Sequence, residues 1–230
     1  MATNVEFASN GSTAGGYLAL PPSGRGPGVL VLQEWWGLDP SLKIMVDRLA
    51  EAGFVALAPD LYHGELAAHD EMDKAGELMN NLPPDRAGRD MSGAIDYLAA
   101  HDAVTGEGIG VMGFCMGGLL TMIIAANRGD RIKAAVPFYG FPPPAMEPDW
   151  SGLQAVVRGH MAGVDDFFTP DAARALEAKL QGLGKDVQLT VHDGAGHAFM
   201  NPQNPLGNLD EALAAKCWAE STAFLHDQLG

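Results

Sequence analysis

The sequence is poor in cysteine and in basic residues. Its 230 residues include two cysteines, Cys115 and Cys217, and 14 Lys and Arg against 29 Asp and Glu, a net charge of −15. Two distant cysteines do not suggest a disulfide framework, so we expect a reduced, cytoplasmic setting in which a free thiol survives. The acidic balance argues against nucleic acid and anionic membrane surfaces as partners.

Long apolar runs are also missing. None approaches the roughly 18 residues that a membrane-spanning helix needs. The residues from Met1 to Phe7 lack the basic and apolar regions of a signal peptide, so we expect neither a membrane span nor secretion. We find no repeat, low-complexity tract or linker-like stretch. The length and the 47% hydrophobic content therefore predict a single α/β domain over residues 1–230.

Short apolar runs alternate with amphipathic segments along the chain. Continuous apolar runs such as 28–33 and 54–58 are typical of strands buried on both faces. The alternation predicts a mostly parallel sheet of about eight strands, with helices on both faces. Residues 63–83 are polar and predict a short helix and loop over the strand ends, a candidate lid. The expected strands lie near 5–8, 15–22, 28–33, 54–58, 108–112, 132–139, 155–161 and 187–191, and the expected helices near 41–52, 85–100, 119–126, 170–183 and 210–229.

The motif Gly113-Phe114-Cys115-Met116-Gly117-Gly118 stands between an apolar strand and an apolar helix. A strand, a sharp glycine-flanked turn and a helix form the arrangement called a nucleophile elbow, here with cysteine in place of serine. The turn is strained, so its neighbours must be small, and it lifts the sulfur above the sheet. The Met116 N–H lies at a helix N-terminus, where it can stabilise an oxyanion.

Other reactive side chains also follow predicted strands. Glu34, the Asp165–Asp166 pair and His197 each come just after one, and the carboxyl ends of such strands form the ligand site of an open parallel sheet. The order Cys115, aspartate, His197 is the chain order of an α/β-hydrolase triad. In such a triad His197 takes the thiol proton and the aspartate orients the imidazole. The sequence pattern leaves Asp165 and Asp166 as alternatives.

Glu34 lies between a buried apolar run and two tryptophans. A carboxylate there is costly unless it is paired, although a strand-end glutamate can also be solvated. We expect a carboxylate near the thiol, with its pKa raised by apolar surroundings. The Trp35 N–H would then be the second oxyanion donor.

Aromatic side chains flank these motifs and predict an aromatic substrate pocket made of Trp35, Trp36, Tyr139 and Phe199. Cys217 falls on the apolar stripe of the last helix, where packing is the expected role. The other histidines show no zinc-type spacing.

From its N-terminal strands to its final helix, the chain resembles the dienelactone hydrolase family of α/β-hydrolases. The resemblance implies the triad Cys115–His197–Asp166, and it favours Asp166 over Asp165. It also implies that Glu34 takes the thiol proton when substrate binds, that no metal or organic cofactor is needed, and that the oxyanion donors are Trp35 and Met116. The motifs that carry it are Gln33-Glu34-Trp35-Trp36-Gly37, Ala58-Pro59-Asp60-Leu61-Tyr62, the elbow, Phe138-Tyr139-Gly140, Asp166-Phe167-Phe168-Thr169-Pro170 and Gly196-His197-Ala198-Phe199.

The chain departs from the family at the substrate carboxylate. Family members that act on dienelactone hold it with arginines, one of them four residues after the histidine, where this chain has Asn201. Residues 63–83 contain no arginine, and Lys74 is their one basic residue. Taken with the resemblance, these residues predict hydrolysis of small esters or lactones through an acyl-thioester. We expect a monomer or small homo-oligomer. The alternatives are a noncatalytic binding protein and a thiol redox sensor on the same fold.

Overall fold

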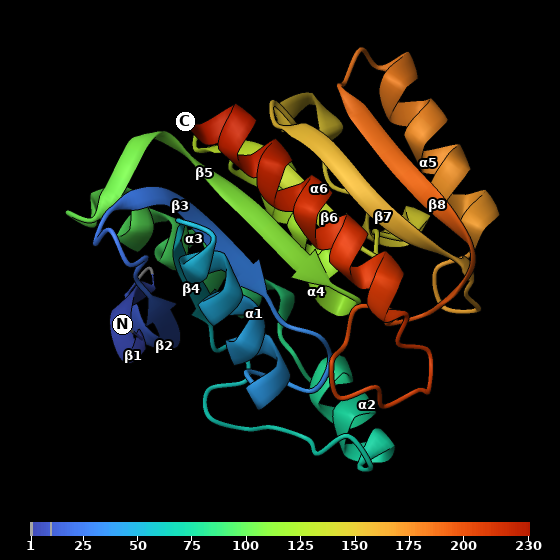
Figure 1. Cartoon of the computed structure of the whole chain (residues 1–230), viewed down its shortest axis with the longest axis horizontal. Coiled ribbons are helices and arrows are strands. Elements are labelled where there is room, and N and C mark those ends of the chain that lie inside the picture. The colour runs from blue at the N-terminus through green and yellow to red at the C-terminus, as the bar shows by residue number, and fades with distance from the viewer. Residues whose placement is uncertain (1, 10) are drawn as a thin grey trace.

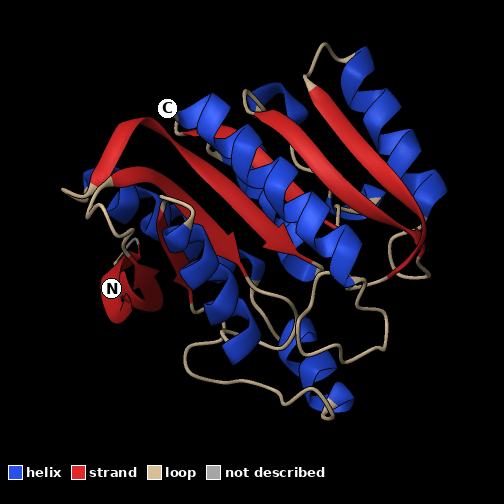
Figure 2. Ribbon diagram, in the orientation of Figure 1, coloured by secondary structure: helices blue, strands red, loops and turns tan. Residues whose placement is uncertain are grey.

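The computed structural model of the chain describes residues 2–9 and 11–230. Within these ranges eight strands form one sheet in the order β1-β2-β4-β3-β5-β6-β7-β8 (Figures 1 and 2). β2 pairs antiparallel with both β1 and β4, and all other neighbours are parallel, which confirms the predicted sheet. The strands are β1 (Ala2–Ser9), β2 (Ser12–Ala19), β3 (Gly26–Leu32), β4 (Val55–Pro59), β5 (Val104–Phe114), β6 (Ile132–Phe138), β7 (Val156–Val164) and β8 (Val187–Gly196).

Helices cover both faces of the sheet, as predicted. α1 and α6 pack on one face and lie in front of it in Figure 1, while α3, α4 and α5 pack on the other. The helices are α1 (Pro40–Glu51), α2 (Met72–Asn80), α3 (Pro84–Ala100), α4 (Met116–Asn127), α5 (Pro170–Gly182) and α6 (Glu211–Leu229). None of the helices in the described part of the chain is both long and apolar enough to cross a bilayer.

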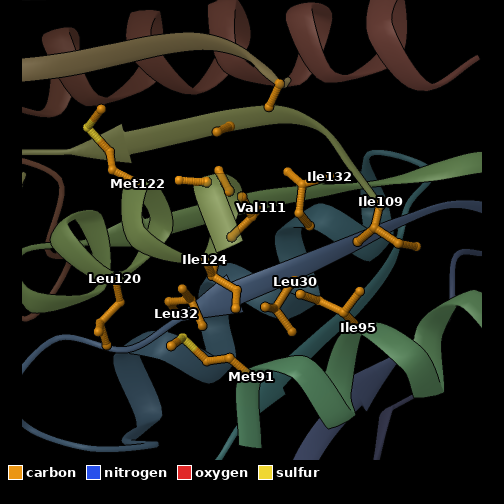
Figure 3. Close-up of a cluster of buried hydrophobic side chains, with 14 of the residues drawn as sticks. Leu30, Leu32, Met91, Ile95, Ile109, Val111, Leu120, Met122, Ile124 and Ile132 are labelled. Carbon is orange, nitrogen blue, oxygen red and sulfur yellow. The ribbon is translucent and has the colours of Figure 1, made fainter. Parts of the chain in front are cut away.

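Burial follows the sequence pattern. Every residue of β3 and β4 is buried, because helices cover these strands on both sides. α3 begins with a proline in its first turn and turns an apolar stripe toward the sheet. In Figure 3, Met91 and Ile95 of this stripe lie against Leu30 and Leu32 of β3. The rigid central strands therefore fix the loops at their carboxyl ends.

The last strand is longer than the sequence suggests. We expected a strand to Val191 and a Gly-rich loop after it, but β8 continues to Gly196. A register shift in the pairing of β7 with β8 lets Val164 pair with Gly196. His197 therefore follows the strand directly, as the first residue of the turn at its carboxyl end.

Candidate active site

Cys115 occupies the turn between β5 and α4. Its backbone has φ 55° and ψ −117°, a conformation that is strained for a residue with a side chain. The glycines around it are required sterically. A Cβ on Gly117 would overlap the carbonyl of Leu32, and one on Gly113 would overlap the carbonyl of Gly117. The turn leaves the half-buried Cys115 at the carboxyl end of β5.

His197 bridges the thiol and a carboxylate. Its Nε2 lies 3.1 Å from Cys115 Sγ, and its Nδ1 lies 2.8 Å from Asp165 Oδ2. Burial opposes a charge on His197. The hydrogen bonds to Asp165 and Cys115 outweigh it and raise the pKa of the imidazole to about 10. At neutral pH the imidazole therefore favours its charged form.

The prediction that Asp166 is the acid is wrong. Asp165 is buried and carries the bond to His197, whereas Asp166 is exposed. Both residues lie just after the end of β7, where the chain bends, and of the two it is Asp165 that faces His197. The N–H groups of Phe167 and Phe168 donate to Asp165 Oδ1 at 2.8 and 3.0 Å, which fixes this carboxylate in the turn.

Glu34 is buried beside the site but is not hydrogen-bonded to the thiol. The Tyr139 hydroxyl donates to Oε1 at 3.2 Å, and the Asn201 amide donates to Oε2 at 2.6 Å. Burial raises the pKa of Glu34, while the bond from Asn201 and the nearby His197 oppose the rise. The resting partner of Cys115 is thus His197, and Glu34 lies in a separate hydrogen-bonded group.

Sequence reasoning missed Tyr139 and Asn201 as the donors that hold Glu34. Tyr139 follows β6 directly, with a φ of 35°, and Asn201 stands four residues after His197. The sequence predicted Tyr139 as a pocket wall, and it showed Asn201 at the position where family members have an arginine. The position of Tyr139 directly after β6 was a usable signal, because parallel strand ends meet at one edge.

Two backbone N–H groups are free to receive an oxyanion. No hydrogen bond among the described residues uses the N–H of Trp35 or that of Met116. Trp35 follows β3, and Met116 is the first residue of α4, where the helix dipole favours negative charge. Trp35, Met116 and Cys115 all line the same pocket.

The pocket has a volume of about 970 Å³ and opens onto Cys115 and His197. Trp35 and Trp36 line it, in the places that the sequence predicted. Tyr139 and Phe199 do not: they are 1% and 0% exposed and pack behind the triad, so their prediction as pocket walls is wrong. Most walls are instead apolar side chains of α3, α4 and the loops after β6 and β7, among them Met91, Leu119, Leu120, Ile123, Phe141, Phe167 and Phe168.

Charged groups in the pocket are few. Arg89 is its one Lys or Arg among the described residues, and it pairs at 2.7 Å with Asp85, another lining residue. Lys74 of α2 is not a lining residue, and Asn201 is buried behind Glu34. The end of α2 does reach the pocket through Met79 and Asn80. Movement of residues 63–83 as a lid stays a prediction.

Comparisons with known proteins point to one family. The sequence model of the Dienelactone hydrolase family matches residues 14–229. Protein usf of Aquifex pyrophilus is 36% identical over 235 residues, which cover 100% of both chains. Carboxymethylenebutenolidase 1 of Cupriavidus pinatubonensis is 30% identical over 237 residues, covering 98% of this chain and 97% of the relative.

A solved structure shows the same fold. The crystal structure of a dienelactone hydrolase-like promiscuous phosphotriesterase from metagenomic libraries superimposes with a TM-score of 0.85 at 24% identity. The match covers 100% of this chain and 99% of the other. Because the family match spans nearly the whole sequence, the chain belongs to the dienelactone hydrolase family.

Proposed function

We propose that the chain is a cysteine-dependent hydrolase of small, uncharged esters and lactones. The observation that carries the proposal is the contact of Cys115 Sγ with His197 Nε2, at 3.1 Å, on a strained turn that faces an apolar pocket. Asp165 completes the arrangement behind the imidazole. Membership of the family supports the reaction class, lactone and ester hydrolysis.

The first half of the reaction transfers the acyl group to sulfur. With the shared proton on His197, the sulfur attacks the carbonyl carbon, and the carbonyl oxygen becomes an oxyanion. The N–H groups of Trp35 and Met116 would stabilise this charge. The imidazolium Nε2 then gives its proton to the leaving alkoxide, which leaves an acyl-thioester on Cys115 and a neutral His197.

The second half returns the enzyme to its resting state. Neutral His197 takes a proton from water, and the hydroxide attacks the thioester carbonyl. Collapse of this intermediate releases the acid and restores the sulfur beside the imidazolium. Asp165 holds the Nδ1 proton throughout, so that Nε2 always faces the sulfur and the reacting oxygen.

The direct test is to trap the acyl-thioester. We expect a chromogenic aryl ester to be turned over with a burst of phenol release, if deacylation is the slower half. Rapid acid quenching and peptide mass mapping should then find the acyl group on the peptide that contains Cys115. An acyl group on another residue, or no turnover of any ester or lactone in a screen, would contradict the proposal.

The pocket predicts a preference for neutral substrates. An anion would meet Arg89 already paired with Asp85, and the buried Glu34 nearby, and no other Lys or Arg of the described residues lines the pocket. A missing charge-assisted contact costs about 1.5–3 kcal/mol, which corresponds to roughly ten- to a hundredfold in kcat/KM. We therefore expect a neutral lactone to be hydrolysed better by this factor than a carboxylate-bearing lactone of similar size.

The measurement is kcat/KM for the two lactones at equal ionic strength. Asp85→Asn is the matched variant, because it releases Arg89 from its partner without changing the shape of the pocket. This variant should reduce the difference in kcat/KM between the neutral and the carboxylate-bearing lactone. A wild-type enzyme that prefers the anion would instead show that the pocket holds an effective cation.

Glu34→Gln should lower kcat/KM less than removal of the Cys115 thiol does. Two donors, from Tyr139 and Asn201, point at the Glu34 carboxylate, and glutamine has one acceptor oxygen to offer them. An unsatisfied buried donor costs about 1–3 kcal/mol. We expect kcat/KM to fall by roughly ten- to a hundredfold, less than on removal of the thiol. Tyr139→Phe, which removes one donor and keeps the ring, should lower it less. An unchanged rate for Glu34→Gln from pH 6 to 9 would make Glu34 structural only.

A further inference from the structure

A second group of reactive side chains lies under α6, on β7 and β8. His160 of β7 pairs in register with Thr190 of β8, and Ala162 pairs with His192. Side chains two residues apart on a strand share a face, so His160 and His192 both point to the face that α6 covers. Their rings are stacked, with centroids 5.3 Å apart.

α6 brings two further groups to the same place. Cys217 and Ser221 are four residues apart, hence on one side of the helix, and both are buried. Cys217 Sγ lies 3.5 Å from His192 Nε2, and His160 Nδ1 lies 3.0 Å from the same His192 Nε2. Ser221 Oγ lies 3.2 Å from His160 Nε2. Cys217 is thus buried as predicted, but against polar groups rather than purely apolar ones.

We propose that His160, His192 and Cys217 form a zinc site. Two imidazoles and a thiolate form a ligand set that binds zinc in preference to calcium or magnesium. Tetrahedral zinc, with bonds of about 2.0–2.1 Å to nitrogen and about 2.3 Å to sulfur, separates two nitrogens by about 3.3 Å and a nitrogen from sulfur by about 3.6 Å. Here His192 Nε2 lies 3.0 Å from His160 Nδ1 and 3.5 Å from Cys217 Sγ, and all three ligand atoms lie within 4.8 Å of one another. A zinc ion therefore needs only small movements of these side chains.

Ser221 supplies the support that such sites usually have. A histidine ligand commonly donates its other ring N–H to a neighbouring acceptor, which fixes the tautomer. His160 Nε2–H donating to Ser221 Oγ leaves the Nδ1 lone pair directed toward His192 and Cys217. Three protein ligands leave the fourth position to water.

The proposed zinc ligands are arranged differently from the side chains around Cys115. His197 contacts Asp165 and Cys115 through opposite ring nitrogens, so those three side chains do not converge on one point. Among the described residues, the group of His160, His192 and Cys217 is the one set of three such side chains whose ligand atoms lie within 4.8 Å of one another. The zinc site is thus separate from the proposed hydrolase chemistry, and either can fail without the other.

Cobalt titration of the chelator-treated, reduced protein tests the proposal. Co²⁺ replaces Zn²⁺ in such sites, and a thiolate ligand gives an intense near-ultraviolet charge-transfer band with visible bands typical of tetrahedral geometry. We expect these bands to saturate at equimolar Co²⁺ and to disappear when Zn²⁺ is added. Zinc alone should also raise the melting temperature of the wild-type protein.

Matched variants assign the bands to residues. Cys217→Ser should lose the charge-transfer band, while Cys115→Ala, which removes the other cysteine, should keep it. Ser221→Ala keeps all three ligands, so it should fold, and it should weaken zinc binding by about 10- to 100-fold. Absence of a thiolate band in the wild type would overturn the zinc site. So would a band that survives Cys217→Ser and disappears in Cys115→Ala.

Discussion

Replacing Cys115 by alanine should lower kcat for ester hydrolysis by about 10⁴- to 10⁶-fold, the usual loss on removing a triad nucleophile. The sulfur is the atom that His197 contacts at the mouth of the pocket, and no other thiol lies there, since Cys217 is buried under α6. Binding energy and the two oxyanion donors would remain, so a small residual rate is expected.

The fold should survive this substitution. Alanine keeps the Cβ of Cys115, so the backbone strain at φ 55° is unchanged, and the sulfur that is lost was only half-buried. Circular dichroism and the melting temperature provide the control for folding. Stopped-flow and steady-state assays with an aryl ester provide the rate. A folded Cys115→Ala protein with near-native turnover would exclude the acyl-thioester.

The fold could be predicted because its signals are local. Apolar runs such as β3 are buried throughout, and the elbow is marked by a short motif of glycines around Cys115. The chain order of nucleophile, acid and histidine then follows from the order of the strands. None of these inferences needed the direction of a particular side chain across the sheet.

Contacts that depend on side-chain direction could not be predicted in this way. Tyr139 and Phe199 stand beside site motifs, yet they point away from the pocket into the core. His160, His192 and Cys217 lie on three elements, and only the register of β7 with β8 and the packing of α6 bring them together. A spacing rule for metal ligands within one segment therefore cannot detect them.

The choice between Asp165 and Asp166 failed for a related reason. A motif match can slip by one residue where a strand ends, and a slip of one reverses the side-chain direction. The turn after β7 decides the matter, because the N–H groups of Phe167 and Phe168 bind Asp165 Oδ1 and leave Oδ2 for His197.

Because Asp165 and not Asp166 contacts His197, the second large loss of activity is expected on changing Asp165. Asp165→Asn should lower kcat by about 10⁴-fold, as expected when an amide forces the wrong imidazole tautomer. Asparagine Oδ1 can still accept from the turn, but its NH₂ group then faces His197 Nδ1. The ring must place its proton on Nε2 and leave Nδ1 as an acceptor, so neutral His197 can no longer accept a proton from water.

Asp166→Asn is the matched control, the same change one residue away on an exposed side chain. It should alter kcat by no more than about twofold, as for a surface change of about 0.5 kcal/mol. The two variants should also differ in their pH profiles. Burial lowers the pKa of His197, but the bonds to Asp165 and Cys115 outweigh burial and raise it to about 10. Activity that needs the imidazolium is therefore present at neutral pH and is lost as the pH rises through about 10.

Removal of the Asp165 carboxylate takes away a hydrogen bond that favours the charged ring. The pKa of His197 should therefore fall, and the alkaline limb of kcat/KM should move to lower pH in Asp165→Asn while staying in place in Asp166→Asn. A merely structural aspartate would lower the rate without moving this limb. If Asp166→Asn instead carries both the loss of kcat and the shift of the limb, the acid of the triad is Asp166, and the turn after β7 adopts a different conformation in the working enzyme.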